Sequence, residues 1–459
     1  MSQFRIETDS LGDVQVPVDA LWGAQTQRAV ENFPVSGLAM PAGFIAAVAH
    51  IKWAAAEANA SLGLLENEQR DAIVSACQTL IEGEYADQFP VDRYQTGSGT
   101  STNMNVNEVV AAIIRQQQGM NIHPNDHVNM SQSSNDVIPT AIHISAATAV
   151  QERLIPALTH LCGAIYGQES RLAEQVKTGR THLMDAMPVT LGQELRTWRE
   201  QILACKARLE TAMDELLAVP QGGTAVGTGV NAGPEFAGQF IRFLKANTGY
   251  SFRELEHKFV GQSAVDAPVA LSGQLRGVAI VLTKIANDLR WMNSGPIHGL
   301  AEISLPALQP GSSIMPGKVN PVIPESVAMA AAQVMGLDST VAIAGQSGNF
   351  QLNVMLPLVA ANLLDMIALL SNASNLLADK AIHGFTVNAK NLNEGVGRNP
   401  VLVTALNPEI GYSLAADIAK EAYASGRPVI DVAEERSGLS RERLEQLMDP
   451  LKLTHQEVT

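Results

Sequence analysis

A short loop between Gln309 and Pro321 carries the residue types that chemistry needs, in a chain otherwise dominated by helical patterns. Its sequence, QPGSSIMPGKVNP, lacks His, Cys, Asp and Glu and places serine, lysine and asparagine among glycines and prolines. Such a backbone can turn several N–H groups toward one point, and Lys318 adds a positive charge. A serine held by these groups, at Ser312 or Ser313, could exist as an alkoxide and take a proton from carbon. A tight loop that grips two helices explains the spacing equally well.

A second polar segment, QTGSGTSTNMNVNE, runs from Gln95 to Glu108 and sets hydroxyl and amide side chains around Gly97 and Gly99. Glycine lets the backbone approach a ligand closely, while hydroxyls and amides supply hydrogen-bond donors. A turn followed by a Ser or Thr helix cap is the plainer interpretation of this segment.

A third segment, HPNDHVNMSQSSNDVIP, contains a run of four polar residues at 133–136 that precedes an expected long helix. A helix cap accounts for one residue of this run and leaves the rest unexplained. A metal site built from its histidines and aspartates is an alternative, but their spacing matches no common ligand pattern.

A fourth segment, KTGRTHLMDAMPVTLGQE, separates two expected bundle helices and contains Arg180, Thr181, His182 and Asp185. An isolated histidine is most often structural, but polar surroundings at such an interruption favour acid–base chemistry for His182. The glycine-rich segment 221–231 lacks the Gly-Lys-Ser/Thr ending of a phosphate-binding loop, and we interpret it as structural.

Long helices must position these segments. Apolar residues recur at alternating steps of three and four in several stretches, and each stretch predicts a helix with one apolar stripe. These stretches are 150–165, 191–216, 275–292 and 359–377. Further helices are expected over 44–62, 66–82 and 103–117. The pattern predicts an all-α, mainly helical fold with an elongated bundle, whose length suggests burial between subunits as well.

The same pattern predicts three domains. Residues 1–138 mix loops with short helices, residues 139–390 form the bundle, and residues 391–459 form a small helical domain. In the last domain we expect a loop over NLNEGVGRNP, and short amphipathic helices over GYSLAADIAKEAYASG and SRERLEQLMDP.

Composition limits the functions that are open to the chain. A net charge of −15 argues against nucleic acid and anionic membranes as partners, and an anionic substrate would need a locally positive site. No uncharged apolar run reaches the ~18 residues of a membrane span. The first residues show no signal or transit pattern, so we expect a cytoplasmic protein.

Cys77, Cys162 and Cys205 lie in apolar helical patterns, which favours core residues over ligands of an iron–sulfur cluster.

Together, the polar segments resemble the shared regions of the fumarase/aspartase superfamily. GSSIMPGKVNP is very similar to the signature of that superfamily, and TGSGTSTNMN, SQSSND and GRTHLMDA resemble its other shared regions, in the expected order. The similarity extends from RIETDSLG to VTALNPEIGY, which is essentially the whole chain. It is closest to the class II fumarases, the metal-free type that interconverts fumarate and (S)-malate in the tricarboxylic acid cycle.

Two alternatives stay open at this stage. Aspartate ammonia-lyase shares the fold and the carbanion chemistry, but aspartases usually have Gly-Ala-Gly-Thr where residues 97–100 read Gly-Ser-Gly-Thr. An inactive relative kept as a structural protein is the other alternative. Ser312, His182 and Lys318 are all present, which favours an active enzyme.

The resemblance also implies an assembly and a set of roles. It implies three mainly helical domains and a homotetramer with a core of about twenty helices and active sites shared by three subunits.

Ser312 resembles the base that removes the C3 proton. His182, paired with Glu325, resembles the residue that activates or protonates water. Lys318 and Asn320 would stabilise the aci-carboxylate intermediate. The other substrate-binding positions are Ser98, Gly99, Thr100, Ser133, Ser134, Asn135, Thr181 and Ser313. The substrate would be a small dicarboxylate, with no metal or other cofactor.

A second, peripheral anion site is implied as well. Its residues are His123, Pro124, Asn125 and Asp126. Some relatives carry an arginine where this chain has Met120 and a lysine where it has Met130. Both departures remove a cation, which weakens the prediction of this second site.

Overall fold

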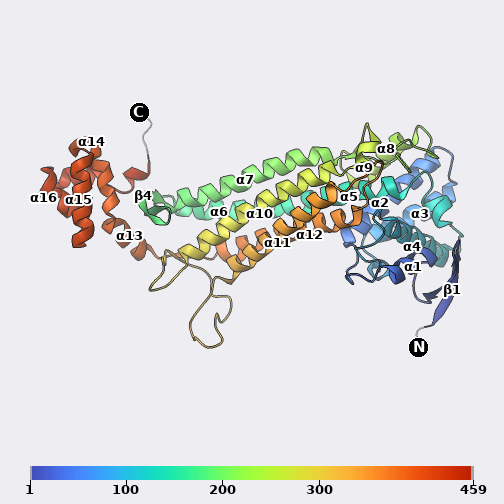
Figure 1. The fold of residues 1–459 in the computed structure, drawn as a ribbon, viewed down its shortest axis with the longest axis horizontal. Helices are drawn as coiled ribbons and strands as arrows, with labels where there is room; N and C mark the ends of the chain where they lie inside the picture. Colours follow the sequence, from blue (N-terminus) through green and yellow to red (C-terminus); the bar gives the residue numbers. More distant parts are fainter. Residues whose placement is uncertain (1–2, 456–459) are drawn as a thin grey trace. The chain divides into compact units, whose positions relative to one another are not determined.

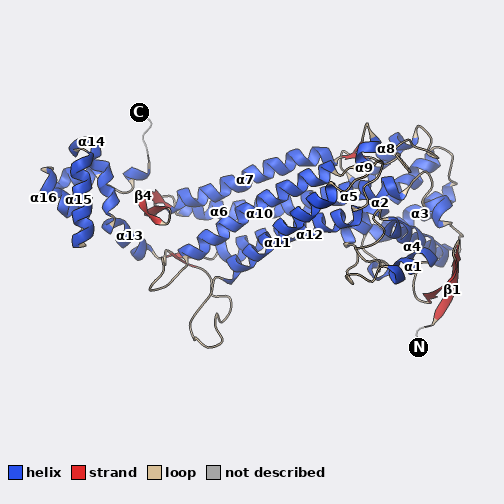
Figure 2. Cartoon of the chain, viewed as in Figure 1, coloured by secondary structure: helices blue, strands red, loops and turns tan. Residues whose placement is uncertain are grey.

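Helices form most of residues 3–455, the part of the chain that the structure, a computed structural model, describes (Figures 1 and 2). This part contains seventeen α-helices, and its strands form four two-stranded sheets. The expected all-α, mainly helical fold class is therefore confirmed. The division into three domains and the helical core shared by a tetramer stay predictions.

The chain divides into two compact units. The first unit holds the chain up to Pro156, Cys205–Ala279 and Ala331–Ser371, and the second holds the remaining residues. The four longest helices each contribute residues to both units. They are α7 (Leu191–Leu216), α10 (Asp266–Met292), α11 (Val322–Gly345) and α12 (Leu356–Leu377).

The first unit is built around α2, which packs against α3, α5 and α8. Alanine makes up much of α2, and small side chains let neighbouring helices approach closely. A hairpin of β1 (Phe4–Asp9) and β2 (Gly12–Pro17) packs on α1. The helices of this unit are α1 (Ala24–Asn32), α2 (Ala42–Ser61), α3 (Asn67–Ile81), α4 (Thr100–Gln118), α5 (Ser134–Ala149), α8 (Phe236–Thr248) and α9 (Lys258–Ser263).

The second unit contains a hairpin and a group of short helices. Strands β3 (Val176–Thr181) and β4 (Met184–Thr190) follow α6 (Ile155–Arg171), and β7 (Ile303–Ser304) pairs with β8 (Thr386–Val387). The helices after β8 are α13 (Ala389–Arg398), α14 (Asn407–Ile410), α15 (Tyr412–Ser425), α16 (Val429–Ser437) and α17 (Arg441–Leu447). The last of these pack around a buried apolar cluster that includes Leu406, Ile418 and Val432.

The expected helices are present, with two differences. The prediction of a loop over NLNEGVGRNP is wrong, because most of this segment belongs to α13. This helix buries Leu392 and Val396, which lie one helical turn apart. The long helix α11 was not expected, because its apolar residues surround the helix and leave no stripe to read. All three cysteines are buried, as expected for core residues.

Three helices in the described part of the chain are long and apolar enough to cross a membrane, judged by length and composition alone. They are α10, α11 and the helical stretch from Leu356 to Ile382. The buried shares of their most apolar windows are 50%, 33% and 67%, so α11 is the least covered by its own chain. The expectation that the protein has no membrane partner stays a prediction.

Candidate active site

The segment before α4 forms a tight turn in the first unit. The Ser98 and Thr100 hydroxyls lie 2.8 Å apart, and Ser98 is only 9% exposed. Gly99, directly before the helix, has a φ of +73°, a region that suits glycine. A Cβ atom at Gly97 would lie 1.9 Å from the backbone oxygen of Val354, so glycine is required there. The two glycines thus fix a pair of hydroxyls at a helix N-terminus, where anions bind favourably.

A second turn, at the start of α5, is held by a buried carboxylate. The Ser133 hydroxyl accepts the Asn135 N–H over 3.2 Å, and Asp136 accepts the Ser133 N–H over 2.9 Å. The other Asp136 oxygen accepts the N–H groups of Gly222 and Thr224 over 3.0 and 2.8 Å. Burial raises the pKa of Asp136 to about 6, and the backbone donors oppose this rise. The glycine-rich segment that we interpreted as structural therefore anchors a predicted substrate-binding turn.

A buried lysine connects α2 to both turns. Lys52 is fully buried and donates to side-chain oxygens of Asn129 and Gln132 over 2.9 and 3.0 Å. Asn103 on α4 donates to the same Asn129 oxygen over 3.1 Å and to the Ser134 hydroxyl over 3.0 Å. Burial lowers the pKa of Lys52 to about 7. Sequence reasoning missed Lys52, because one lysine within an apolar helix pattern has no distinctive spacing.

The segment around His182, which we expected to separate two bundle helices, is a β-hairpin of the second unit. His182 and Leu183 form its turn, with φ values of +55° and +60°. Such turns normally take Asn-Gly, so two bulky residues in this conformation store backbone strain. Thr181 ends the preceding strand, and all three residues are exposed. The hairpin therefore presents an imidazole and a hydroxyl at its tip.

The Ser312 hydroxyl is held by backbone donors, as the sequence suggested for a serine in this loop. Its oxygen accepts the N–H groups of Ile314 and Met315 over 3.3 and 3.0 Å. Two donors on one hydroxyl oxygen favour negative charge on that oxygen. Ser313 is exposed, whereas Ser312 is half-buried. This geometry distinguishes the two serines, which spacing alone did not.

A cavity of about 420 Å³ borders the same loop in the second unit. The Lys318 ammonium donates to the Asn320 side-chain oxygen over 2.6 Å, and both residues line the cavity with Glu325. Arg290 also lines it, which adds a second cation. No hydrogen bond or ion pair joins His182 to Glu325 within residues 3–455 of this single chain. Their predicted pairing therefore stays a prediction.

The residues of the predicted second anion site lie together in the first unit. The His123 ring nitrogen accepts the Asp126 N–H over 3.1 Å, at the start of the short helical turn Pro124–Val128. A cavity of about 470 Å³ is lined by His123, Pro124 and Asn125, together with Arg5 and Arg115. The described residues contain no group of three or more His, Cys, Asp or Glu side chains that could hold a metal ion. The expected absence of a cofactor stays a prediction.

Known proteins resemble this chain over nearly its whole length. Residues 12–336 match the lyase family, and residues 402–455 match the C-terminal segment of fumarase C. A class II fumarate hydratase of Pseudomonas aeruginosa is 57% identical over 99% of both chains. Its counterpart in Mycobacterium tuberculosis is 49% identical over 99% of this chain and 97% of the relative.

Solved structures agree with these relatives. The class II fumarase of Schistosoma mansoni matches with a TM-score of 0.96 at 36% identity, over 99% of this chain and 100% of that one. A cobalt-bound fumarate lyase:delta crystallin of Brucella melitensis matches with a TM-score of 0.94 at 44% identity, over 99% of this chain and 100% of that one. The helical fold and the matched regions define a lyase. Within that class, the chain belongs to the family of class II fumarate hydratases.

Proposed function

We propose that the chain catalyses the reversible hydration of fumarate to (S)-malate in the tricarboxylic acid cycle. The Ser312 loop is the observation that carries this proposal. It combines a hydroxyl that accepts two backbone N–H groups with a lysine and an asparagine that line the neighbouring cavity. When a base removes a proton from the carbon next to a carboxylate, negative charge develops on that carboxylate. Hydrogen-bond donors and a cation near the carboxylate are needed to stabilise this charge.

In the dehydration direction, the Ser312 oxygen takes a proton from C3 of (S)-malate. The electron pair of the C–H bond moves onto the adjacent carboxylate, giving an aci-carboxylate that Lys318 and Asn320 stabilise. The C2 hydroxyl then leaves with a proton from His182, which forms fumarate and water. Hydration follows the same steps in reverse, with Glu325 orienting the His182 ring.

The remaining predicted site residues bind and orient the dicarboxylate. Ser98 and Thr100 supply hydroxyls at the N-terminus of α4, and Ser133–Asn135 supply hydroxyl, amide and backbone donors at the start of α5. Neutral donors suit a doubly charged substrate, because an acidic group beside it would repel it. Ser313 and Thr181 add hydroxyls from the Ser312 loop and the hairpin.

We further propose a homotetramer with shared active sites. Only 33% of the most apolar window of α11 is buried within the chain, and Met329 and Ile343 on this helix are 68% and 59% exposed. An apolar helix that its own chain leaves uncovered needs a partner surface. Packing of identical helices from other subunits would provide that surface and bring the site residues of different chains together.

The proposed location is the cytoplasm, with no nucleic acid as a partner. An odd and sparse set of three cysteines suits a reducing compartment, and the net charge of −15 would repel polyanions. Fractionation of cells that express the tagged chain tests the location. Recovery of the enzyme with membranes would contradict it.

The decisive experiment follows fumarate absorbance in purified protein given (S)-malate or L-aspartate. Fumarate should form from malate and not from aspartate, and malate should form from fumarate. Formation from aspartate alone would select aspartate ammonia-lyase, and formation from neither would indicate an inactive structural relative. Activity should also survive an excess of chelator. Loss of activity in chelator that iron restores would contradict the metal-free mechanism.

A further inference from the structure

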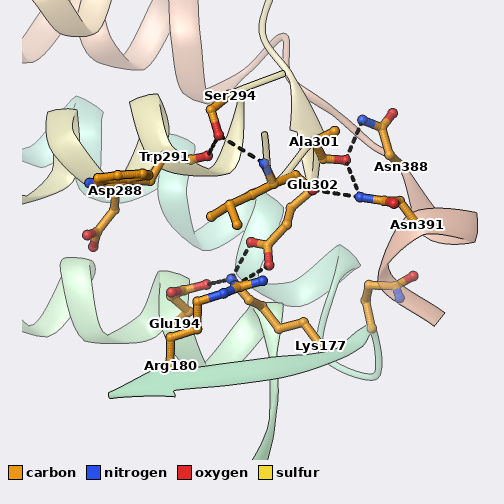
Figure 3. Close-up of polar contacts among 12 residues, drawn as sticks. Lys177, Arg180, Glu194, Asp288, Trp291, Ser294, Ala301, Glu302, Asn388 and Asn391 are labelled. Carbon is orange, nitrogen blue, oxygen red and sulfur yellow. Dashed lines mark hydrogen bonds and ion pairs between the residues drawn. The ribbon is translucent and has the colours of Figure 1, made fainter. Parts of the chain in front are cut away.

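Glu302 lies where three elements of the second unit meet. Its backbone N–H donates to the carbonyl of Met292, the last residue of α10, over 2.8 Å. Its own carbonyl accepts the N–H of Asn388 over 2.9 Å, just before α13 begins. The segment before it is held as well, because the Asn388 side chain donates to the Ala301 carbonyl over 2.8 Å (Figure 3). The backbone of Glu302 is therefore fixed from both sides.

The side chain of Glu302 points from this junction toward strand β3 (Figure 3). One carboxylate oxygen accepts from the Lys177 ammonium over 2.5 Å, and the other accepts from the Arg180 guanidinium over 2.5 Å. Lys177 also donates to Glu194 at the start of α7 over 2.7 Å. The Lys177 and Glu302 side chains are 4% and 3% exposed, so water screens their interaction little.

Strand β3 is irregular where it meets this carboxylate. Residues three apart on a regular strand face opposite sides of the sheet, yet Lys177 and Arg180 both contact Glu302. The pairing of β3 with β4 shifts register between Thr178 and Arg180. A Cβ atom on the intervening Gly179 would lie 2.6 Å from the Met187 carbonyl, so glycine permits this close approach. The irregularity turns both cations to one anion.

Two predicted reactive segments continue from this cluster. Arg180 is followed directly by Thr181 and the strained turn at His182, and Glu302 begins the segment that leads through β7 to Ser312. Glu302 is the close partner of Arg180, since the other carboxylate near that guanidinium, Asp185, lies 3.9 Å away. Loss of the Glu302 charge would therefore free Arg180, and the hairpin turn that carries His182 would lose its anchor.

We propose that Glu302 is a positioning residue for the hydration reaction, fixing the His182 turn through Arg180 and Lys177. The inference rests on the proposed function, since it assumes that His182 moves the proton to or from water. Glu302 itself touches no reacting atom. A displacement of a catalytic group by about 1 Å can lower the rate by about 10²-fold. The groups that bind the substrate would stay in place, so turnover should fall and substrate binding should change little.

The test compares Glu302→Gln with Glu169→Gln in the purified full-length protein. Glu169 is a matched control, because its carboxylate pairs with Arg199 over 2.7 Å between α6 and α7 and is 15% exposed. We expect kcat of Glu302→Gln to fall more than about tenfold with KM nearly unchanged, and Glu169→Gln to keep wild-type turnover. Equal effects of the two substitutions, or wild-type kcat in Glu302→Gln, would overturn the proposal.

A double-mutant cycle separates positioning from a general structural role. If Glu302 acts through His182, then adding Glu302→Gln to His182→Asn should cause no further loss of kcat. A structural defect would lower kcat by the same factor in both backgrounds, and that result would overturn the proposal. Should Glu302→Gln fail to fold, Arg180→Lys keeps the charge and loses the planar contact, and the same cycle applies with a smaller loss. A wild-type protein that does not hydrate fumarate would contradict the proposed function instead.

Discussion

The Asn320 side-chain amide donates to the Gly311 carbonyl over 2.5 Å and closes the reactive loop at its base. Gly311 sits so close to the returning chain that a Cβ atom there would lie 1.9 Å from the Lys318 carbonyl. Gly311 thus allows the two ends of the loop to approach closely, because it has no side chain, and the Asn320 amide joins them. Ser312, directly after this glycine, takes its position from that closure.

Replacing Gly311 with alanine should therefore open the loop. The added methyl group cannot fit beside the Lys318 carbonyl, so the backbone must move and carry Ser312 away from the substrate. We expect kcat to fall by about 10²-fold or more, with the thermal unfolding midpoint lowered little because the loop is exposed. Gly238→Ala on α8 is the control, since nothing lies within 4 Å of its Cβ position. Similar kinetics in both variants would refute this account of the loop.

Ser312→Ala should abolish most activity, whereas Ser313→Ala should be mild. Only the Ser312 oxygen accepts two loop N–H groups, so only this hydroxyl is prepared to hold negative charge. We expect the rate of (S)-malate dehydration to fall by about 10³-fold or more in Ser312→Ala, equivalent to about 4 kcal/mol of barrier. Binding of a dicarboxylate should change far less. Retention of more than about a tenth of the wild-type rate would exclude Ser312 as the base.

Shared active sites predict rescue between inactive variants. Ser98 lies in the first unit and His182 in the second, and the proposed tetramer supplies them to one site from different subunits. Tetramers reassembled from Ser98→Ala and His182→Asn chains should recover part of the wild-type rate, while each variant alone stays inactive. Light scattering should show tetramers of 48.9 kDa subunits. A fully active monomer, or mixtures without any recovery, would contradict sharing.

How much the sequence reveals depends on whether a feature leaves a local pattern. The apolar stripe of α7 recurs at helical steps, and its expected bounds agree with the helix observed. The helix α11 has no stripe, so periodicity cannot find it. The His182 hairpin was missed for a similar reason, because its turn holds His-Leu in place of the glycine that marks such turns.

The polar side chains divide in the same way. Ser312, Lys318 and Asn320 stand in one loop of unusual composition, so sequence reasoning selects them together. Lys52 and Glu302 are single charged residues whose partners lie far away in the sequence, at Asn129 and Lys177. Their burial and pairing depend on tertiary packing, which no local spacing encodes.

A buried histidine on α5 should make stability depend on pH. His143 is 6% exposed, and its ring lies 3.0 Å from the Leu216 carbonyl. Burial lowers the pKa of His143 to about 4 from 6.5, while its backbone partners oppose the shift. Between these values the unfolded chain binds a proton that the folded chain does not, so stability falls as pH decreases through this window. The full loss is about 3 kcal/mol per subunit.

Other groups titrate in the acid range, so the test compares variants and not pH values alone. The raised pKa of Asp136 acts in the opposite direction, because the folded chain then binds the extra proton, but this effect is common to wild type and variant. In His143→Gln, the free energy of unfolding in urea should fall less steeply with decreasing pH than in wild type, by about 1.4 kcal/mol per pH unit. His257→Gln, at an exposed position, should keep the wild-type slope at equal protein concentration. Equal slopes for His143→Gln and wild type would mean that the buried ring accepts its proton in the folded state.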